Sequence, residues 1–484
     1  MVPTVEEMLV SHHQTIEHAL KVIDKNAQGI CFVVGDKKEF LGVVSDGDIR
    51  RGLLKGSDLQ TPLTRIMNSK AFTLPVTTAD ELIQASLTDK VRYIPLLDEK
   101  NVPVDYACSH RLHRIPIMEP VLGGNELSYV TECIKSGWIS SKGSFVGRFE
   151  ESMAKFCHVP HMVAVSNGTV ALHLALEALG IGEGDEVIVP DFTFAASINA
   201  VIYTGATPVL VDIDPETWTI NIEEIKKAIT PKTRAIMPVH IYGHPCDMDA
   251  IMAIAREHNI LVVEDCAEAL GSYYKGKPVG SFGEAATFSF FGNKVITTGE
   301  GGMVCFKHKA HFEKGKILRD HGMSPEKRYW HQEVGFNYRM TNLQAAIGVA
   351  QMEQLGGFLQ KRKEMAGEYD KAFHAIAGVK PQPLKDWAVS CHWLYTVLVD
   401  ESTKQDRDDL IRKLLLNGIE TRPTFYPLHV MPPYQKYAGN RSFRNCQEVS
   451  RRGISLPSSV TIEISEIKNI ARRIHSLLDL NSLR

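Results

Sequence analysis

Short apolar runs alternate with helical patterns between about residues 115 and 360, and this alternation restricts the fold more than any other feature of the chain. The runs are rich in Val and Ile and are largely uninterrupted by polar residues, which is typical of strands covered on both faces. The order predicts βαβ units and a mostly parallel sheet. The expected strands are 162–166, 186–190, 208–212, 235–240, 260–265, 286–291 and 302–306, and the expected helices include 169–180 and 248–259.

Two further domains are expected beside this large domain of residues 115–360. Residues 361–484 predict a smaller α/β domain, and residues 1–114 precede both. A chain of 484 residues has room for two or three ordinary domains. The charged triplet at 361–363 is interpreted as a solvated helix face. In the smaller domain the expected helices are 361–376, 406–418 and 464–480, and the expected strand is 393–399.

Residues 1–114 contain the same order of elements twice. In the first copy an amphipathic helix at 15–26 precedes apolar strands at 29–35 and 40–45, and Asp48 can start another helix. The repetition predicts a duplicated small α/β module. The weaker second copy has its helix, strand and strand at 79–87, 92–99 and 102–107.

This module resembles the paired cystathionine-β-synthase-type (CBS) domains that bind adenine nucleotides in many regulated enzymes. The likeness lies in the element order and in GVVSDGDIRRGL, where the family's Ser/Thr-x-x-Asp signature falls on Ser45 and Asp48. The resemblance implies that Asp48 holds a ribose hydroxyl of a regulatory nucleotide. The second copy has no Asp three residues after its Ser109 and so departs from the pattern. A purely structural or oligomer-forming module is the alternative.

Charge and hydropathy exclude two classes of protein. Lys and Arg number 54 against 57 Asp and Glu, a net charge of −3, and no stretch forms the basic stripe of a nucleic-acid-binding protein. No apolar run approaches the ~18 residues of a membrane span, and the start of the chain lacks the apolar core of a signal peptide. We therefore expect a cytoplasmic protein that binds neither nucleic acid nor membrane.

The nine cysteines are scattered along the chain and never spaced Cys-x-x-Cys. This usage predicts reduced thiols, mostly buried, without a disulfide framework or a thiolate zinc site. We expect no metal among the site residues.

Two loop features of the large domain suit an anionic ligand. The residues Ser166 to Thr169 join a strand to a helix, so they can hold a phosphate at the helix N-terminus; a plain helix cap is the alternative. Glu264 and Asp265 end a buried strand, where an acid is well placed to contact a ligand. The alternative for Asp265 is a helix-capping role.

Two more features add an amine and an aromatic ring. Lys294 lies between an apolar strand and a Gly-rich turn, where lost hydration lowers its pKa and makes a neutral amine available for Schiff-base chemistry; a surface charge is the alternative. Ser289 precedes it and offers a second phosphate ligand. Phe192 or Phe194 can stack on a flat ring, with core packing as the alternative for both. A phosphate cradle, an aromatic ring, an acid and a lysine in this order are what pyridoxal phosphate (PLP) requires.

In addition, the chain from about residue 115 onward resembles the sugar-nucleotide aminotransferases of the DegT/DnrJ/StrS family. The resemblance implies the α/β, aspartate aminotransferase-like (type I) fold of PLP-dependent transferases, here joined to an N-terminal CBS pair. The matching segments, in the family's order, include SNGTVALHLALEALGIGEGDEVIVP, VHIYGHPCDMDAIM, VEDCAEALGS, FSFFGNKVITTGEGGM and GFNYRMTNLQAAIG.

The resemblance also implies roles for particular residues. Lys294 would form the Schiff base and Asp265 would pair with the pyridinium nitrogen. Asn337 would reach the phosphate bound by a neighbouring subunit, which makes a homodimer the minimal active unit. Glu268 would lie near the phenolic oxygen of the cofactor, where many relatives carry Gln. The phosphate ligands would be Gly168, Thr169 and Ser289, the stacking ring Phe194, and the sugar-nucleotide contacts Trp138, Ser140, Lys142, His331, Phe425 and His429.

The function that the resemblance implies is transamination of a nucleotide-linked 4-keto-6-deoxy hexose with L-glutamate as donor. We expect GDP-4-keto-6-deoxymannose as the acceptor, and a UDP-linked 4-keto hexose is the first alternative. The family's dehydratase branch replaces the Schiff-base lysine with histidine, so Lys294 argues against it. A catalytically silent nucleotide-sensing protein is a further alternative, and so is an active enzyme tuned by nucleotide at Ser45 and Asp48.

Overall fold

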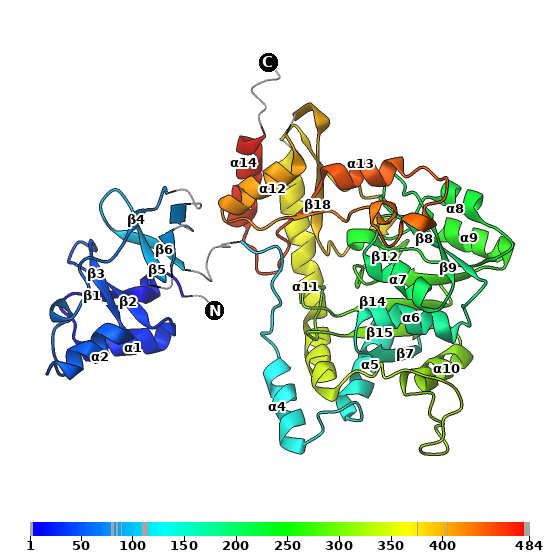
Figure 1. Cartoon of the computed structure of the whole chain (residues 1–484), viewed down its shortest axis with the longest axis horizontal. Helices are drawn as coiled ribbons and strands as arrows, with labels where there is room; N and C mark the ends of the chain where they lie inside the picture. Colours follow the sequence, from blue (N-terminus) through cyan, green and yellow to red (C-terminus); the bar gives the residue numbers. More distant parts are fainter. Residues whose placement is uncertain are drawn as a thin grey trace. The chain divides into compact units, whose positions relative to one another are not determined.

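The computed structural model describes residues 3–78, 82–83, 86–88, 90–108, 115–374, 376–403 and 405–478 (Figure 1). The chain divides into two compact units. The first consists of Met1–Arg114 and Lys413–Ile419, and the second of Ile115–Arg412 and Glu420–Arg484. Ser109, which breaks the pattern of the second copy, lies outside the described residues. The division that we expect at residue 361 stays a prediction, since one helix runs through this position.

The first unit contains two small sheets with the same pairing pattern. In each sheet the first two strands are parallel and the last two antiparallel. This common pattern agrees with the predicted duplication. The elements are β1 (Leu9–Ser11), α1 (Ile16–Asn26), β2 (Ile30–Val34), β3 (Phe40–Ser45), α2 (Asp46–Leu54), β4 (Leu74–Pro75), β5 (Tyr93–Leu97) and β6 (Pro103–Cys108), with short 3-10 turns at Glu6–Met8 and Leu63–Arg65.

The second unit is built on a seven-stranded sheet in the order β7-β15-β14-β11-β10-β8-β9, in which β15 alone is antiparallel to its neighbours. Each strand lies within or next to a run expected from the sequence, so the mostly parallel sheet is confirmed. The strands are β7 (His161–Val165), β8 (Glu186–Pro190), β9 (Thr207–Val211), β10 (Thr233–Ile236), β11 (Leu261–Asp265), β14 (Ala285–Ser289) and β15 (Gly302–Phe306).

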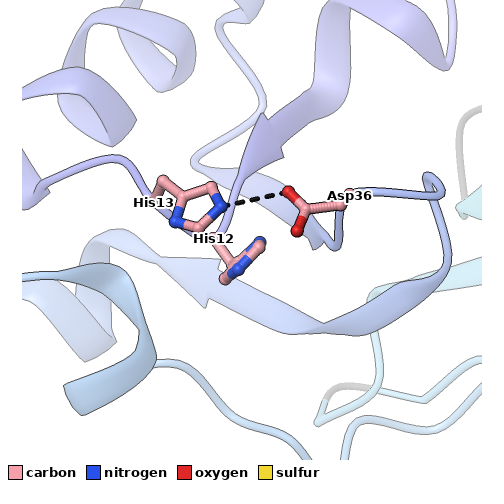
Figure 2. A group of neighbouring side chains, drawn as sticks. All are labelled: His12, His13 and Asp36. Atoms are coloured by element: carbon pink, nitrogen blue, oxygen red, sulfur yellow. Dashed lines mark hydrogen bonds and ion pairs between the residues drawn. The ribbon is translucent and has the colours of Figure 1, made fainter.

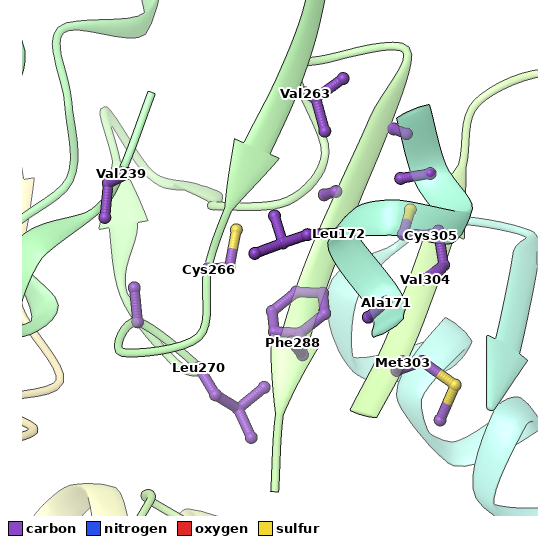
Figure 3. Close-up of a cluster of buried hydrophobic side chains, with 14 of the residues drawn as sticks. Ala171, Leu172, Val239, Val263, Cys266, Leu270, Phe288, Met303, Val304 and Cys305 are labelled. Carbon is purple, nitrogen blue, oxygen red and sulfur yellow. The ribbon is translucent and has the colours of Figure 1, made fainter. Parts of the chain in front are cut away.

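Helices cover both faces of this sheet, as the uninterrupted apolar strands predict. Along β8, Val187 and Val189 join the cluster that contains α6 (Gly168–Ala178) and α7 (Ala195–Tyr203). Ile188 points the other way, into a cluster with α8 (Ile222–Ala228) and α9 (Met248–His258). Figure 3 shows the first cluster, where Leu172 of α6 lies against the strand that carries Phe288. Burying a side chain such as Leu172 contributes about 1.5–3 kcal/mol.

A long helix of the second unit, α11 (Asn342–His374), packs against α4, α5 and α14. A four-stranded antiparallel sheet, in the order β16-β18-β20-β19, follows it in sequence. No helix among the described residues is both long and apolar enough to cross a membrane. The other elements are α4 (Glu126–Ser136), α5 (Ser144–Cys157), α10 (Lys309–Arg319), β12 (Tyr273–Tyr274), β13 (Lys277–Pro278), β16 (Val379–Pro381), β17 (Ala388–Val389), β18 (Tyr395–Val399), α12 (Arg407–Leu416), β19 (Arg422–Pro423), α13 (Arg444–Arg452), β20 (Gly453–Leu456) and α14 (Ile464–Leu477), with short 3-10 turns at Ile241–Gly243, Glu401–Thr403, Leu428–Val430 and Gln435–Tyr437.

The charged triplet on α11 does not form a uniformly solvated face. Lys361 and Lys363 are exposed, but Arg362 is buried, so the interpretation from sequence is wrong for this residue. Arg362 Nη1 donates to the carbonyls of Trp393 (3.0 Å), His392 (3.2 Å) and Ser458 (3.2 Å). The guanidinium therefore supplies donors to loop carbonyls that lie away from water, as buried polar groups require.

We predict that Arg362→Met destabilises the protein by about 1–3 kcal/mol, because these buried carbonyls lose their donor. The matched control is Lys363→Met on the same helix, which should stay within about 0.5 kcal/mol of the unchanged chain because its side chain is exposed. Melting temperatures of the two variants measure the difference. Equal melting temperatures would contradict a structural role for Arg362.

Candidate active site

The predicted site residues gather at one edge of the seven-stranded sheet. Asp265 is the last residue of β11, and Ser289 is the last residue of the neighbouring parallel strand β14. β7 ends at Val165, three residues before α6 begins at Gly168. Ligands of open α/β proteins bind outside the carboxyl ends of parallel strands. The strand order therefore places an acid, a hydroxyl and a helix N-terminus together, as expected from the sequence.

A close approach between α6 and β14 forms a cradle for an anion. The side chain of Asn167 caps α6 by accepting the N–H of Val170 (3.0 Å), and Thr169 lies in the first turn. A Cβ atom on Gly168 would lie 2.9 Å from Cβ of Ser289, so only glycine permits this spacing. The free N–H groups at the start of the helix and the hydroxyls of Ser289 and Thr169 suit a phosphate.

The acid at this edge is buried and accepts two hydrogen bonds. Asp265 is buried, and burial raises the pKa of its carboxyl. Two donors oppose this effect: Ser197 Oγ donates to Oδ2 (2.8 Å), and the N–H of Ala267 donates to Oδ1 (3.1 Å). The sequence analysis misses Ser197, because a serine one turn into a helix carries no signal of the partner that folding gives it.

Lys294 presents a buried amine to the same space. Its Nζ lies 4.0 Å from Oε1 of Glu268 and 3.8 Å from the centre of the Trp393 ring. Burial lowers the pKa of Lys294, and burial also raises the pKa of Glu268 to about 7. The second carboxylate oxygen of Glu268 accepts the N–H of Tyr242 (2.8 Å). The amine and the carboxyl thus influence each other's pKa through their charges but lie farther apart than a hydrogen bond.

Three nearly parallel aromatic rings form a wall beside the amine. The ring of Tyr242 lies 6.1 Å from Trp393 at 11° and 5.3 Å from Phe425 at 16°. Phe194 is 60% exposed and lies 6.0 Å from Phe425, whereas Phe192 is 1% exposed and packs in the core. Phe194 is therefore the ring of the two that has a face free for stacking. The sequence analysis assigns Trp393 only to a strand-like run and misses its contact with Lys294.

A second group of predicted residues is linked through Arg339. Its Nε donates to Oδ1 of Asn337 (3.0 Å), and its Nη2 lies 3.3 Å from Nε2 of His321, whose carbonyl accepts Nδ1 of His331 (2.8 Å). Arg339 also lines a cavity of about 190 Å³ together with exposed Lys142. Positive side chains dominate this group, which suits an anionic substrate.

The other predicted substrate residues differ in their surroundings. Trp138 and Ser140 precede α5, and their carbonyls accept hydrogen bonds from the side chain and the main chain of Asn342 (2.7 and 3.0 Å). His429 is engaged in the fold: Nδ1 donates to the buried carboxylate of Asp191 (2.6 Å). The structure thus gives His429 a partner that the sequence analysis does not foresee.

In the first unit, Ser45 and Asp48 form a capping box at the start of α2. The N–H of Ser45 donates to Oδ2 of Asp48 (3.0 Å), and Nη2 of Arg51 donates to Oδ1 (2.6 Å). Both residues line a cavity of about 620 Å³, along with Arg92 and Tyr93. This volume lies in the range of small-molecule sites.

The residues at the edge of the sheet fit PLP. The Gly168–Ser289 approach provides the phosphate cradle, Asp265 the acid, Lys294 the amine and Phe194 an open aromatic face. All nine cysteines are buried, as predicted.

Comparisons with known proteins point to the same chemistry. Residues 120–475 match the profile of the DegT/DnrJ/EryC1/StrS aminotransferase family, and residues 2–55 match that of the CBS domain. GDP-perosamine synthase from Escherichia coli O157:H7 is 48% identical over 362 residues, covering 75% of this chain and 98% of that protein. GDP-perosamine synthase from Vibrio cholerae is 45% identical over 358 residues, covering 74% of this chain and 97% of that protein.

Solved structures give the same result. The aminotransferase TlmJ from Streptoalloteichus hindustanus superposes with a TM-score of 0.71 at 30% identity, covering 76% of this chain and 99% of that one. The PLP form of the putative sugar aminotransferase Spr1654 from Streptococcus pneumoniae has a TM-score of 0.70 at 29% identity, covering 75% of this chain and 98% of that one. The likeness extends over almost the whole length of each of these structures.

We predict that Glu268→Gln shifts the pH dependence of cofactor binding to lower pH. The carboxylate of Glu268 raises the pKa of Lys294, so the uncharged amide leaves the amine neutral at a lower pH. The rate at which the apoprotein takes up PLP, followed by absorbance across pH, measures the shift. Glu257→Gln, an exposed change on α9, should leave the profile unchanged. Identical profiles for all three proteins would contradict the coupling.

Proposed function

Because the chain belongs to the DegT/DnrJ/EryC1/StrS aminotransferase family, we propose that it transfers the amino group of L-glutamate to carbon 4 of GDP-4-keto-6-deoxymannose. As a member of this family it is a PLP-dependent sugar aminotransferase with the type I fold. The choice of a GDP-linked sugar is supported by the GDP-perosamine synthases, which are 45–48% identical over nearly their whole length.

The observation that carries the proposal is the buried amine of Lys294 between Trp393 and Glu268. Its nearest carboxylate oxygen is 4.0 Å away, so no tight ion pair holds the amine charged. A neutral amine in this place is a nucleophile towards an aldehyde and a base towards an acidic C–H. The centre of the Trp393 ring lies 3.8 Å from the amine, and the Lys294 side chain is only 13% exposed.

PLP, when bound, supplies an electron sink that acidifies the C–H bond next to the amino group. Lys294 would anchor the cofactor and, in each half-reaction, move a proton between the reacting carbon of the bound substrate and the cofactor. Asp265 would hold a negative charge at the pyridine nitrogen, with Ser197 orienting the carboxylate through its hydrogen bond. Glu268, whose oxygen lies 4.0 Å from Nζ, would compensate the charge of Lys294 when the amine is protonated. Gly168, Thr169 and Ser289 would hold the phosphate, and Phe194 would cover the ring.

We also propose that two copies of the chain form the active enzyme, with Asn337 completing the phosphate site of its partner. Large apolar side chains on and after α4 support this arrangement: Leu127 is 81%, Ile134 63% and Trp138 57% exposed. A second copy would remove this apolar surface from water. The sugar nucleotide would contact Trp138, Ser140, Lys142, His331 and Phe425, while His429 would fix the loop that carries Phe425 through its bond to Asp191.

The first unit supports a second function, binding of a regulatory nucleotide. The cavity of about 620 Å³ beside Ser45 and Asp48 is lined by Lys90 and Arg92, whose charges suit phosphate groups, and by the ring of Tyr93. Asp48 offers a carboxylate oxygen to a ribose hydroxyl if Arg51 moves from its present 2.6 Å contact.

We predict that an adenine or guanine nucleotide changes turnover of the full chain, and that Asp48→Asn weakens the response at least ten-fold in nucleotide concentration, since a charge-assisted hydrogen bond is lost. Turnover measured across nucleotide concentration tests this. An absent response would leave the first unit a structural module, and an equal response in both proteins would contradict a role for Asp48 in binding the nucleotide.

The substrate proposal is tested by offering GDP-4-keto-6-deoxymannose and UDP-4-keto-6-deoxy-GlcNAc separately, with PLP and L-glutamate. We expect release of 2-oxoglutarate and a 4-amino product with the GDP sugar. Lys294→Ala should abolish turnover of either sugar and Lys294→Arg should not restore it, because the arginine side chain stays protonated. Preference for the UDP sugar would overturn the substrate, and turnover without Lys294 would overturn the mechanism.

A further inference from the structure

Two groups of side chains in the described part of the chain bring three possible metal ligands within 4.8 Å of one another. One group is His12, His13 and Asp36 in the first unit, and the other is His240, Glu264 and Cys266 in the second. The two groups differ in whether their ligand atoms are already engaged, and this difference decides which of them is a metal site.

The group in the second unit is a hydrogen-bonded part of the core. Glu264 accepts the N–H groups of Gly280, Phe282 and Gly283, each at 2.8 Å, and pairs with Nε2 of His240 (3.2 Å). Burial raises the pKa of the Cys266 thiol well above its usual range, so the sulfur stays protonated. The side chains of His240 and Glu264 are therefore engaged in hydrogen bonds of the core, and the protonated thiol of Cys266 is unsuited to bind a metal.

The backbone brings the group of the first unit together at one sheet edge. β1 and β2 are parallel, with Ser11 opposite Val34, so the residues that follow both strands leave the sheet on the same side. The N–H of His12 donates to the carbonyl of Val34 (3.0 Å). Asp36 lies in the turn between β2 and β3, which is closed by a hydrogen bond from the N–H of Gly35 to the carbonyl of Glu39 (2.9 Å).

The side chains of this group point toward one another (Figure 2). The two imidazole rings are adjacent, with centres 3.8 Å apart, and Nε2 of His13 donates to Oδ1 of Asp36 (3.0 Å). Nδ1 of His12 is buried and has no hydrogen-bond partner among the described residues. A buried nitrogen without a partner is rare in native proteins and calls for a ligand. The unpartnered nitrogen thus supports a ligand site independently of the convergence of the three side chains.

We propose that His12, His13 and Asp36 bind a divalent transition-metal ion, with Zn²⁺ as the preferred ion. Two imidazole nitrogens and one carboxylate oxygen suit Zn²⁺, Co²⁺ or Ni²⁺ better than Mg²⁺ or Ca²⁺, which prefer oxygen ligands alone. Ligand atoms of a tetrahedral zinc site lie about 3.3 Å apart at bond lengths of about 2.0–2.1 Å. The 3.0 Å separation of His13 and Asp36 is already close to that value.

This site departs from the expectation of no metal drawn from the sequence. A bound ion would replace the proton between His13 and Asp36 and would bond to the imidazole of His12 as well. It also ties the end of β1 to the turn that follows β2. With three protein ligands the ion keeps one position open to water, because the side chains of His13 and Asp36 are 67% and 77% exposed.

The proposal is tested on the full-length chain, prepared without an affinity tag and stripped with EDTA, by calorimetric titration with ZnCl₂. We expect one Zn²⁺ per chain, an association constant at least ten-fold lower for His13→Gln and for Asp36→Asn, and no binding of MgCl₂. The matched control is His18→Gln, an exposed histidine on α1 outside the group, which should bind Zn²⁺ like the unchanged chain.

A melting experiment separates a lost site from a damaged fold. Zinc should raise the melting temperature of the unchanged chain and of His18→Gln, because an ion that binds only the folded state stabilises it. His13→Gln and Asp36→Asn should melt with the unchanged chain when zinc is absent and should not respond to it. Equal zinc affinity in all four proteins, or equal binding of Mg²⁺, would overturn the proposal.

Discussion

The burial of one amine is the constraint around which the second unit is arranged. An isolated charge away from water is costly, so a buried lysine either loses its proton or gains compensating groups. Lys294 can be neutral or protonated. Glu268 is near enough to compensate a positive charge on the amine but too far to keep it protonated through a hydrogen bond. The aromatic face of Trp393 covers the amine, and Arg362 fixes the carbonyl of Trp393 from the long helix α11.

The sheet supplies the rest of the site through its topology. Parallel neighbours end at one edge, so Asp265 and Ser289, 24 positions apart in sequence, become neighbours without any long-range recognition beyond strand pairing. Gly168 then allows the N-terminus of α6 to approach Ser289. The same rule applies on a smaller scale in the first unit, where the parallel pair β1 and β2 brings two histidines to an aspartate. Both sites depend on where parallel strands stop.

Sequence periodicity predicts what depends on local pattern. The strands of the large sheet, the helices over them and the residues at strand ends follow from the alternation of apolar runs, and the comparisons confirm the family and the cofactor. Contacts made only by tertiary packing could not be foreseen. Arg362 stands between two exposed lysines and has the composition of a solvated face, yet its helix turns it inward. The three-residue strand β1 is too short to show the alternation of apolar and polar residues typical of a strand. The proximity of His12 to Asp36 could therefore not be predicted from the sequence either.

Because Lys294 and Glu268 are shielded from solvent and Lys142 is exposed, ionic strength affects these charges differently. Dissolved ions screen exposed charges over about 10 Å at 0.1 M salt, but they reach buried pairs far less. The mutual effect of Lys294 and Glu268 on their pKa values is therefore little changed by added salt. The attraction that we propose between an anionic sugar nucleotide and exposed Lys142 weakens as salt is added. Added salt will therefore raise the substrate concentration that the enzyme needs for half-maximal turnover, while the rate of the chemical step stays constant.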